Sequence, residues 1–273
     1  MKFDGIMIIT DLDGTFFNSK GEIAERNIEA VEYFKKNGGL FTIATGRSPM
    51  SPPWLDEIFT PLVNAPAILC NGAFCYDFKK KERIGEIELN YEKAVEISMA
   101  VQRDFPDITV RLTLNSGENK LSREDKIEIV GEKYYITGSQ TTEIQGWTRV
   151  SFDGDEDSTN RVRARFEKEY SKYFAMMKPC PIIYEFQDIS ATKGQALDRL
   201  RAHLKKIGIS DENARIYAIG DYENDLDLLA HADIAACPEN AIDKVKKTSQ
   251  IQLCHCDNGA IADLIERIEL ELR

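Results

Sequence analysis

Short apolar runs alternate with amphipathic helical patterns in the first and last parts of the chain, and this alternation restricts the possible folds most strongly. The apolar runs lie at residues 6–9, 40–44, 67–70, 216–219 and 234–236, and the helical patterns at 25–37, 193–206, 226–230 and 261–272. In the first helical pattern, Ile28, Val31 and Phe34 share one helix face. Strands that alternate with helices favour parallel βαβ units, so we expect an α/β fold with a Rossmann-like, doubly wound parallel sheet.

The middle of the chain has a different texture. Between residues 74 and 90, apolar and polar residues alternate on both sides of the charged tip KKKER. The segments ITVRLTL, EKYYITG and WTRVSFDG resemble strands of a half-exposed antiparallel sheet. Helical patterns lie at 91–105 and 159–174. We therefore expect an inserted α+β cap domain at 77–184, which interrupts a catalytic core made of residues 1–76 and 185–273.

Composition limits the possible partners of the chain. Its 273 residues carry a formal net charge of −11. Proteins that bind nucleic acids or anionic lipids use clusters of Lys and Arg, so this acidic composition argues against such partners. No apolar run approaches the roughly 20 residues of a membrane span, and the N-terminus lacks the pattern of a signal peptide. We therefore expect a cytoplasmic protein, a monomer or small homo-oligomer, that binds neither nucleic acid nor membrane and keeps its six cysteines reduced.

Acidic residues follow two of the predicted strands. Asp11 and Asp13 come directly after the first strand, and Asp221, Asn224 and Asp225 follow the strand at 216–219. Ligands of open α/β sheets bind beyond the carboxyl ends of the strands, so both groups are expected at the binding edge. Carboxylates held close together repel each other unless a cation neutralises them, and a cluster of oxygen ligands favours Mg²⁺.

Two other interpretations of these acids were weighed. Acids after strands are commonly turn and helix-cap residues, and each of these residues taken singly fits that role. A calcium-binding loop starting at Asp11 would need glycine at its sixth position, where this chain has Phe16, and no helix precedes it. The calcium interpretation is therefore excluded.

Four ordered motifs resemble those of the haloacid dehalogenase superfamily of phosphatases. They are DLDGT at 11–15, ATGRS at 44–48, the lysine of SATKGQAL at 193, and GDYEND at 220–225. The segments CNGA at 70–73, CPENA at 237–241 and DNGAIADLIE at 257–266 are similar to the Cof-type sugar phosphatase branch, whose α+β cap lies between the second and third motifs. The resemblance covers nearly the whole core, whereas the cap matches only in position and texture.

The resemblance implies roles for the acids. Asp11 would be the nucleophile that forms an aspartyl phosphate, and Asp13 the acid and base that protonates the leaving oxygen and then activates water. Mg²⁺ would be bound by the Asp11 carboxylate, the Asp13 backbone carbonyl and Asp221.

The resemblance also implies a set of phosphate-binding and supporting residues. Phosphate or substrate would be bound by Thr45, Gly46, Asn71, Lys193 and Asn224. Asp225 would orient Lys193 or a metal-bound water from behind. Ordinary alternatives stay open, namely helix-cap roles for Thr45, Asn224 and Asp225 and a generic turn at Asn71 and Gly72.

We therefore expect a Mg²⁺-dependent phosphatase for small phosphorylated metabolites, such as sugar phosphates or phosphorylated cofactors. A phosphomutase of the same architecture and a non-enzymatic sensor of phosphorylated metabolites are the alternatives. The cap is expected to close over substrate and to choose the leaving group. In the cap or its hinge, Arg111, Arg149 and Glu185 are polar candidates for which a surface role is expected.

The segment CHC at 254–256 also contains residues that bind metals. Its one-residue spacing lacks a second ligand pair elsewhere in the chain, so we expect buried thiols around a turn there rather than a metal site.

Overall fold

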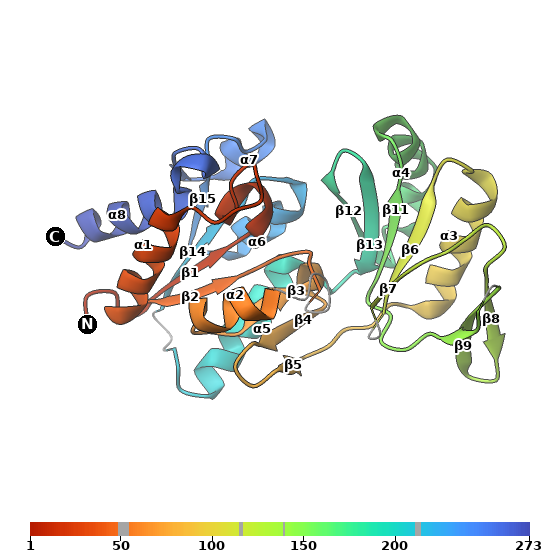
Figure 1. Cartoon of the computed structure of the whole chain (residues 1–273), viewed down its shortest axis with the longest axis horizontal. Coiled ribbons are helices and arrows are strands. Elements are labelled where there is room, and N and C mark those ends of the chain that lie inside the picture. Colours follow the sequence, from red (N-terminus) through yellow and green to blue (C-terminus); the bar gives the residue numbers. More distant parts are fainter. Residues whose placement is uncertain (49–54, 115–116, 139, 211–213) are drawn as a thin grey trace. The chain divides into compact units, whose positions relative to one another are not determined.

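The chain forms two units in the computed structural model, which describes residues 1–48, 55–114, 117–138, 140–210 and 214–273 (Figure 1). Unit 1 comprises Met1–Glu86 and Thr192–Arg273, and unit 2 is the segment Ile87–Ala191 between them. Unit 1 is therefore built from two stretches of chain that are far apart in the sequence.

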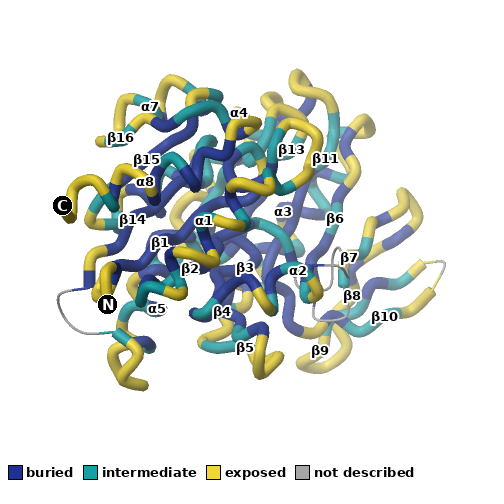
Figure 2. Tube along the Cα trace, turned by 60° about the vertical axis from the view of Figure 1, so that its left-hand side comes forward, coloured by how far each residue is buried: buried dark blue, intermediate teal, exposed yellow. Residues whose placement is uncertain are grey.

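A five-stranded parallel sheet forms the centre of unit 1. Its strands lie in the order β16-β15-β14-β1-β2, and every neighbouring pair is parallel. Their bounds are β1 (Ile6–Thr10), β2 (Leu40–Ile43), β14 (Arg215–Ile219), β15 (Ile234–Cys237) and β16 (Ile251–Gln252). All five residues of β1 are buried, as Figure 2 shows in dark blue, because helices cover both faces of the sheet and require apolar residues on each.

Helices lie on both faces of this sheet. They are α1 (Glu25–Lys36), α2 (Leu55–Leu62), α5 (Lys193–Lys206), α6 (Leu226–His231), α7 (Asp243–Thr248) and α8 (Ala260–Glu271). Ile216 and Ala218 share one apolar cluster with residues of α5, α6 and α7. Tyr217, which alternates with them along β14, reaches Glu271 of α8 on the opposite face. The predicted doubly wound α/β core is thus the observed fold.

A short antiparallel sheet extends the edge of unit 1. It consists of β3 (Ala67–Leu69), β4 (Phe74–Asp77) and β5 (Glu82–Ile84), and a parallel bridge between Ala44 and Ile68 links it to the chain after β2. Because β4 pairs with β3 and β5 pairs with β4, the first unit continues past the expected boundary at residue 76.

Unit 2 consists of antiparallel sheets and two helices. The larger sheet has the order β12-β13-β11-β6-β7 and the smaller one the order β10-β9-β8. The strands are β6 (Thr109–Leu114), β7 (Gly117–Lys120), β8 (Lys126–Val130), β9 (Lys133–Thr137), β10 (Thr142–Glu143), β11 (Arg149–Asp153), β12 (Phe174–Cys180) and β13 (Ile183–Asp188). The strand β13 belongs to this unit, so unit 2 extends past the expected boundary at residue 184.

The helices of unit 2 are α3 (Tyr91–Asp104) and α4 (Glu156–Tyr170), and both pack on one face of the larger sheet. Val162 and Phe166 of α4 contact the same core as Val150 and Phe152 of β11. Helix α4 begins earlier than the pattern at 159–174 predicts, because the Asp155 carboxylate accepts a hydrogen bond from the Ser158 amide at 2.7 Å and caps the helix there.

Among the described residues, no helix combines the length and apolar character that crossing a bilayer would need.

Candidate active site

Three predicted acids converge at the carboxyl edge of the parallel sheet. Asp11 directly follows β1, and Asp221 lies just beyond the neighbouring strand β14. Asp225 is held beneath Asp221, because its Oδ2 accepts hydrogen bonds from the amides of Asp221 at 3.0 Å and Tyr222 at 3.2 Å. Carboxylate oxygens of the three aspartates all lie within 4.8 Å of one another.

Lys193 bridges two of these acids. Its Nζ lies 2.6 Å from Asp11 Oδ1 and 2.6 Å from Asp225 Oδ1. The lysine is the first residue of α5. The Thr192 hydroxyl accepts a hydrogen bond from the Gln195 amide and so fixes the start of this helix. Only 1% of Lys193 is exposed, and Asp225 is fully buried, so the charges are compensated within the protein rather than by water.

Burial and crowding shift the pKa values of this cluster. Burial raises the pKa of Asp11 well above its usual range, the charge of Asp225 adds to this, and Lys193 opposes it. Burial by itself lowers the pKa of Lys193, but Asp11 and Asp225 outweigh it and raise that pKa, so the lysine is charged. The pKa of Asp221 is raised to about 7, by burial first and by Asp225 second, whereas a hydrogen bond from Thr15 lowers it.

The donor set fits a divalent cation. Asp11, Asp221 and Asp225 bring three carboxylates together around one lysine, so the cluster carries excess negative charge. Oxygen ligands of this kind suit a hard cation such as Mg²⁺. The backbone leaves room for the Asp221 carboxylate, because Gly14 has a φ of +77° and a Cβ built there would lie 2.6 Å from Asp221 Oδ2.

The Asp13 side chain lies outside this cluster. Its carboxylate is 59% exposed and accepts two hydrogen bonds from the Arg47 guanidinium, from Nε at 2.9 Å and from a terminal nitrogen at 2.6 Å. The same guanidinium lies over the Phe17 ring, with 5.7 Å to the ring centroid. The predicted acid and base is therefore positioned by an arginine.

The predicted phosphate-binding residues form a second group at the same edge. Thr45 follows β2, which pairs with β1, and the Asn71 amide donates to the Thr45 carbonyl at 3.0 Å. The Asn224 side chain donates to Asn71 Oδ1 at 3.3 Å. A Cβ built on Gly46 would lie 3.1 Å from the nitrogen and the oxygen of the Asn71 side-chain amide, so Gly46 and Asn71 are neighbours. The Thr45 hydroxyl accepts a hydrogen bond from the Arg47 amide at 3.2 Å, which forms a local turn.

Three residues of this region were not assigned by sequence reasoning. They are Thr15, whose hydroxyl donates to Asp221 Oδ1 at 2.9 Å, Arg47, and Asn240, whose side chain donates to the Gly14 carbonyl at 2.7 Å. All three lie within the quoted motifs DLDGT, ATGRS and CPENA, so the motifs contained the signal.

The expected surface role of Arg149 and Glu185 in unit 2 is wrong. Arg149 is 6% exposed and Glu185 3%, and they form an ion pair at 3.6 Å. The Ser151 hydroxyl donates to Glu185 at 3.2 Å, and Arg111 pairs with Asp153 at 2.8 Å. These residues alternate along their strands with the apolar residues of the core, so they form the polar face of the larger sheet.

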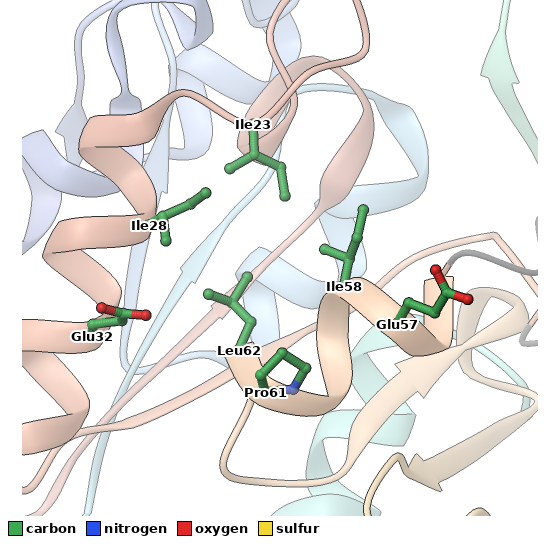
Figure 3. Close-up of a pocket in the computed structure, with 7 residues that line it drawn as sticks. All are labelled: Ile23, Ile28, Glu32, Glu57, Ile58, Pro61 and Leu62. Atoms are coloured by element: carbon green, nitrogen blue, oxygen red, sulfur yellow. The ribbon is translucent and has the colours of Figure 1, made fainter.

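Unit 1 also carries an apolar groove between α1 and α2, shown in Figure 3. Isoleucine and leucine side chains line it together with two glutamates, and its lining residues are Ile23, Ile28, Glu32, Glu57, Ile58, Pro61 and Leu62. None of the predicted site residues lies among them, so the groove is separate from the acidic cluster.

The chain matches one protein family over most of its length. The family model described as haloacid dehalogenase-like hydrolase matches residues 8–265. The 5-amino-6-(5-phospho-D-ribitylamino)uracil phosphatase YwtE of Bacillus subtilis (strain 168) is 27% identical over 295 residues, covering 96% of this chain and 97% of YwtE.

Solved structures show the same fold. A haloacid dehalogenase-like hydrolase from B. subtilis superposes with a TM-score of 0.75 at 18% identity, over 95% of this chain and 98% of that structure. A subclass IIB sugar phosphatase of the same superfamily superposes with a TM-score of 0.70 at 17% identity, over 98% of this chain and 100% of that structure.

Proposed function

Because the chain belongs to the haloacid dehalogenase-like hydrolase family, we propose that it is a Mg²⁺-dependent phosphatase that acts through an aspartyl phosphate. The observation that carries this proposal is the buried cluster in which Lys193 contacts both Asp11 and Asp225 while Asp221 lies beside them. A buried carboxylate at the end of a central strand, next to the fixed ammonium group of Lys193, is suited to act as a positioned nucleophile.

Asp11 attacks the phosphorus atom, and the bond from phosphorus to the leaving alcohol oxygen breaks. Asp13 gives its proton to that oxygen, then takes a proton from the water that attacks the aspartyl phosphate. This second step releases inorganic phosphate and restores the Asp11 carboxylate. When bound by Asp11, Asp221 and the Asp13 carbonyl, Mg²⁺ supplies positive charge that stabilises the transferring phosphoryl group.

Lys193 opposes the rise in the pKa of Asp11 that burial causes, and so favours the ionised carboxylate that the attack requires. Asp225 fixes the position of the ammonium group by the second ion pair at 2.6 Å. The Thr45 hydroxyl, the Gly46 amide and the side chains of Asn71 and Asn224 donate hydrogen bonds to the phosphate oxygens. Arg47 fixes the exposed Asp13 carboxylate by two hydrogen bonds, and Asp13 meets the leaving oxygen in this proposal.

The substrate is a small phosphorylated metabolite, such as a sugar phosphate or a phosphorylated cofactor. This choice is supported by the relatives, which include a phosphatase for a ribitylaminouracil phosphate and a sugar phosphatase. In this proposal, unit 2 is the cap domain that selects the leaving group, and the enzyme works in the cytoplasm.

The test is phosphate release from a panel of phosphorylated metabolites, with and without Mg²⁺, by the natural chain and by Asp11→Asn. We expect the substitution to lower turnover by at least about a thousandfold, because the amide is a poor nucleophile. Asp104→Asn, which changes an exposed aspartate of unit 2, is the matched control and should keep full activity.

Three outcomes would contradict the proposal. Continued phosphate release by Asp11→Asn would refute the assignment of the nucleophile. Formation of an isomeric sugar phosphate instead of free phosphate would identify a phosphomutase, and binding without turnover would identify a sensor.

A further inference from the structure

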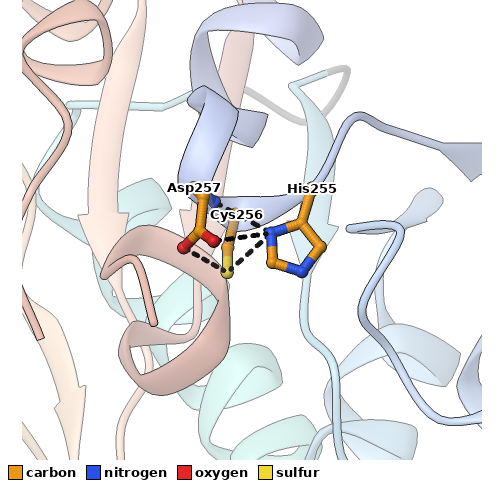
Figure 4. Close-up of side chains that lie close together, drawn as sticks. All are labelled: His255, Cys256 and Asp257. Atoms are coloured by element: carbon orange, nitrogen blue, oxygen red, sulfur yellow. Dashed lines mark hydrogen bonds and ion pairs between the residues drawn. The ribbon is translucent and has the colours of Figure 1, made fainter. Parts of the chain in front are cut away.

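Three consecutive side chains, His255, Cys256 and Asp257, turn their donor atoms toward one another outside the acidic cluster (Figure 4). His255 Nδ1 lies 3.7 Å from Cys256 Sγ and 3.4 Å from Asp257 Oδ2. Cys256 Sγ lies 3.8 Å from Asp257 Oδ1. One nitrogen, one sulfur and one carboxylate, which contributes Oδ2 to one contact and Oδ1 to the other, therefore form a compact triangle.

The local backbone produces this triangle. His255 is extended, with φ −56° and ψ 145°, and Cys256–Asn258 form a single helical turn that ends at Gly259, whose φ is +79°. The Asp257 amide donates to His255 Nδ1 at 3.2 Å. Nδ1 is thus a hydrogen-bond acceptor, and it faces the turn formed by Cys256 and Asp257.

The separations match the requirements of a tetrahedral ion. Zn²⁺ binds His nitrogen, carboxylate oxygen and thiolate sulfur at about 2.0–2.3 Å, which places the ligand atoms of a tetrahedral set with one sulfur roughly 3.3–3.7 Å apart. The distances from His255 Nδ1 to Asp257 Oδ2 and to Cys256 Sγ, 3.4 and 3.7 Å, lie in that range, and the ligand atoms of all three residues lie within 4.8 Å of one another.

The neighbours of the triangle leave its donors usable. The Ser19 amide donates to Asp257 Oδ1 at 2.7 Å, which fixes the carboxylate and leaves Oδ2 for an ion. Cys256 is buried, whereas the side chains of His255 and Asp257 are 35% and 43% exposed, so an ion can enter from their side. A thiolate and a carboxylate together balance the two positive charges of the ion.

We propose that His255 Nδ1, Cys256 Sγ and Asp257 Oδ2 form a binding site for a borderline-soft divalent cation of the Zn²⁺ type, with water as the fourth ligand. Binding replaces the 3.2 Å hydrogen bond to Nδ1 and releases the thiol proton of Cys256 to solvent. The site goes beyond the proposed phosphatase function and does not depend on it.

This assignment changes the expectation for the segment CHC. The third donor is Asp257 rather than a second thiol, because the Cys254 thiol is directed at the Asn258 carbonyl, with Sγ 3.6 Å from that oxygen. The spacing of cysteines in the sequence does not reveal this site, because Asp257, the third donor, lies immediately after the segment CHC.

The test is titration of the full chain, freed of metals by a chelator, with Co²⁺ and then Zn²⁺ in excess Mg²⁺, which occupies the hard acidic cluster. We expect one equivalent of Co²⁺ to produce a thiolate-to-cobalt charge-transfer absorption that Zn²⁺ abolishes. Cys256→Ser should lose this absorption, and His255→Ala and Asp257→Asn should weaken Co²⁺ binding at least about tenfold. Cys254→Ser is the matched control and should bind as the natural chain does.

The melting temperature gives an independent reading, because an ion that binds only the folded chain stabilises it. Zn²⁺ should raise the melting temperature of the natural chain and of Cys254→Ser, but not of His255→Ala, whose change lies at the surface. Absence of the charge-transfer band, its survival in Cys256→Ser, or its loss in Cys254→Ser would overturn the proposal.

Discussion

Replacing Lys193 with methionine tests the charge balance on which the site depends. Methionine keeps most of the apolar volume of the buried stem but leaves Asp11 and Asp225 without the ammonium group that lies 2.6 Å from each. Removing one partner from a buried ion pair costs about 3–5 kcal/mol, because the remaining charge stays buried without compensation. We therefore expect unit 1 of the metal-free protein to lose about 3–5 kcal/mol of unfolding free energy at neutral pH.

Native-state hydrogen exchange of the β1 amides measures this loss in unit 1 alone. The strand β1 lies between β2 and β14 and carries Asp11 at its end, so its most protected amides exchange only when unit 1 opens. Lys206→Met, which makes the same substitution at an exposed position of the same helix, is the matched control and should cost less than about 1 kcal/mol.

Two further measurements separate a charge effect from a packing effect. The loss in Lys193→Met should shrink as pH falls, because burial raises the pKa of Asp11 and protonation neutralises that carboxyl. The double variant with Asp225→Asn should be less destabilised than Lys193→Met, because one of the two unpaired charges is removed. A loss below about 1 kcal/mol in Lys193→Met, or an equal loss at low and neutral pH, would refute the reasoning.

Two other predictions follow from the same edge of the sheet. Gly14→Ala and Gly21→Ala both place alanine at a φ of +77°, which costs about 1 kcal/mol of stability in each variant. Only the Cβ at position 14 would approach Asp221, to within 2.6 Å of its carboxylate. Calorimetry should therefore find weakened Mg²⁺ binding in Gly14→Ala alone. The pKa of Asp221 is raised to about 7, so between about pH 4 and about pH 7 the metal-free native state holds a proton that the unfolded chain has lost. This residue therefore makes the free energy of unfolding fall as pH rises from about 4 to about 7. Mg²⁺ must displace that proton, so its affinity should rise with pH up to about 7 and then level off, and titrations of Asp221→Asn at several pH values should show a weaker, flatter dependence.

Long periodic segments allowed much of the core to be predicted. The pattern at 193–206 has the bounds of α5, and the apolar run at 216–219 lies within β14. Helix α7 and strand β16 were not predicted, because six and two residues are too few for a periodic pattern to be distinguished from a loop. Tertiary packing, rather than local sequence, forms such short elements.

The position of the acids was predictable, whereas the direction of their side chains was not. The ends of two strands placed Asp11 and Asp221 at one edge, since neighbouring parallel strands end on the same side. The pairing of Asp13 with Arg47 depends on side-chain rotamers of two separate loops, which no pattern in the sequence specifies. The burial of Arg149 likewise depends on which face of a sheet becomes covered, and alternation alone does not determine this.

The origin of unit 1 from two distant stretches has a consequence during synthesis on the ribosome. Asp11 emerges early, but Lys193 is translated 182 residues later, after all of unit 2, and β14 follows it. Until then β1 has β2 on one side and no partner on the other, so a nascent chain carries an open apolar strand edge that can pair wrongly. Assembly of the acidic cluster must therefore wait until residues 193–225 have been made, and a chain that terminates before Lys193 cannot form it.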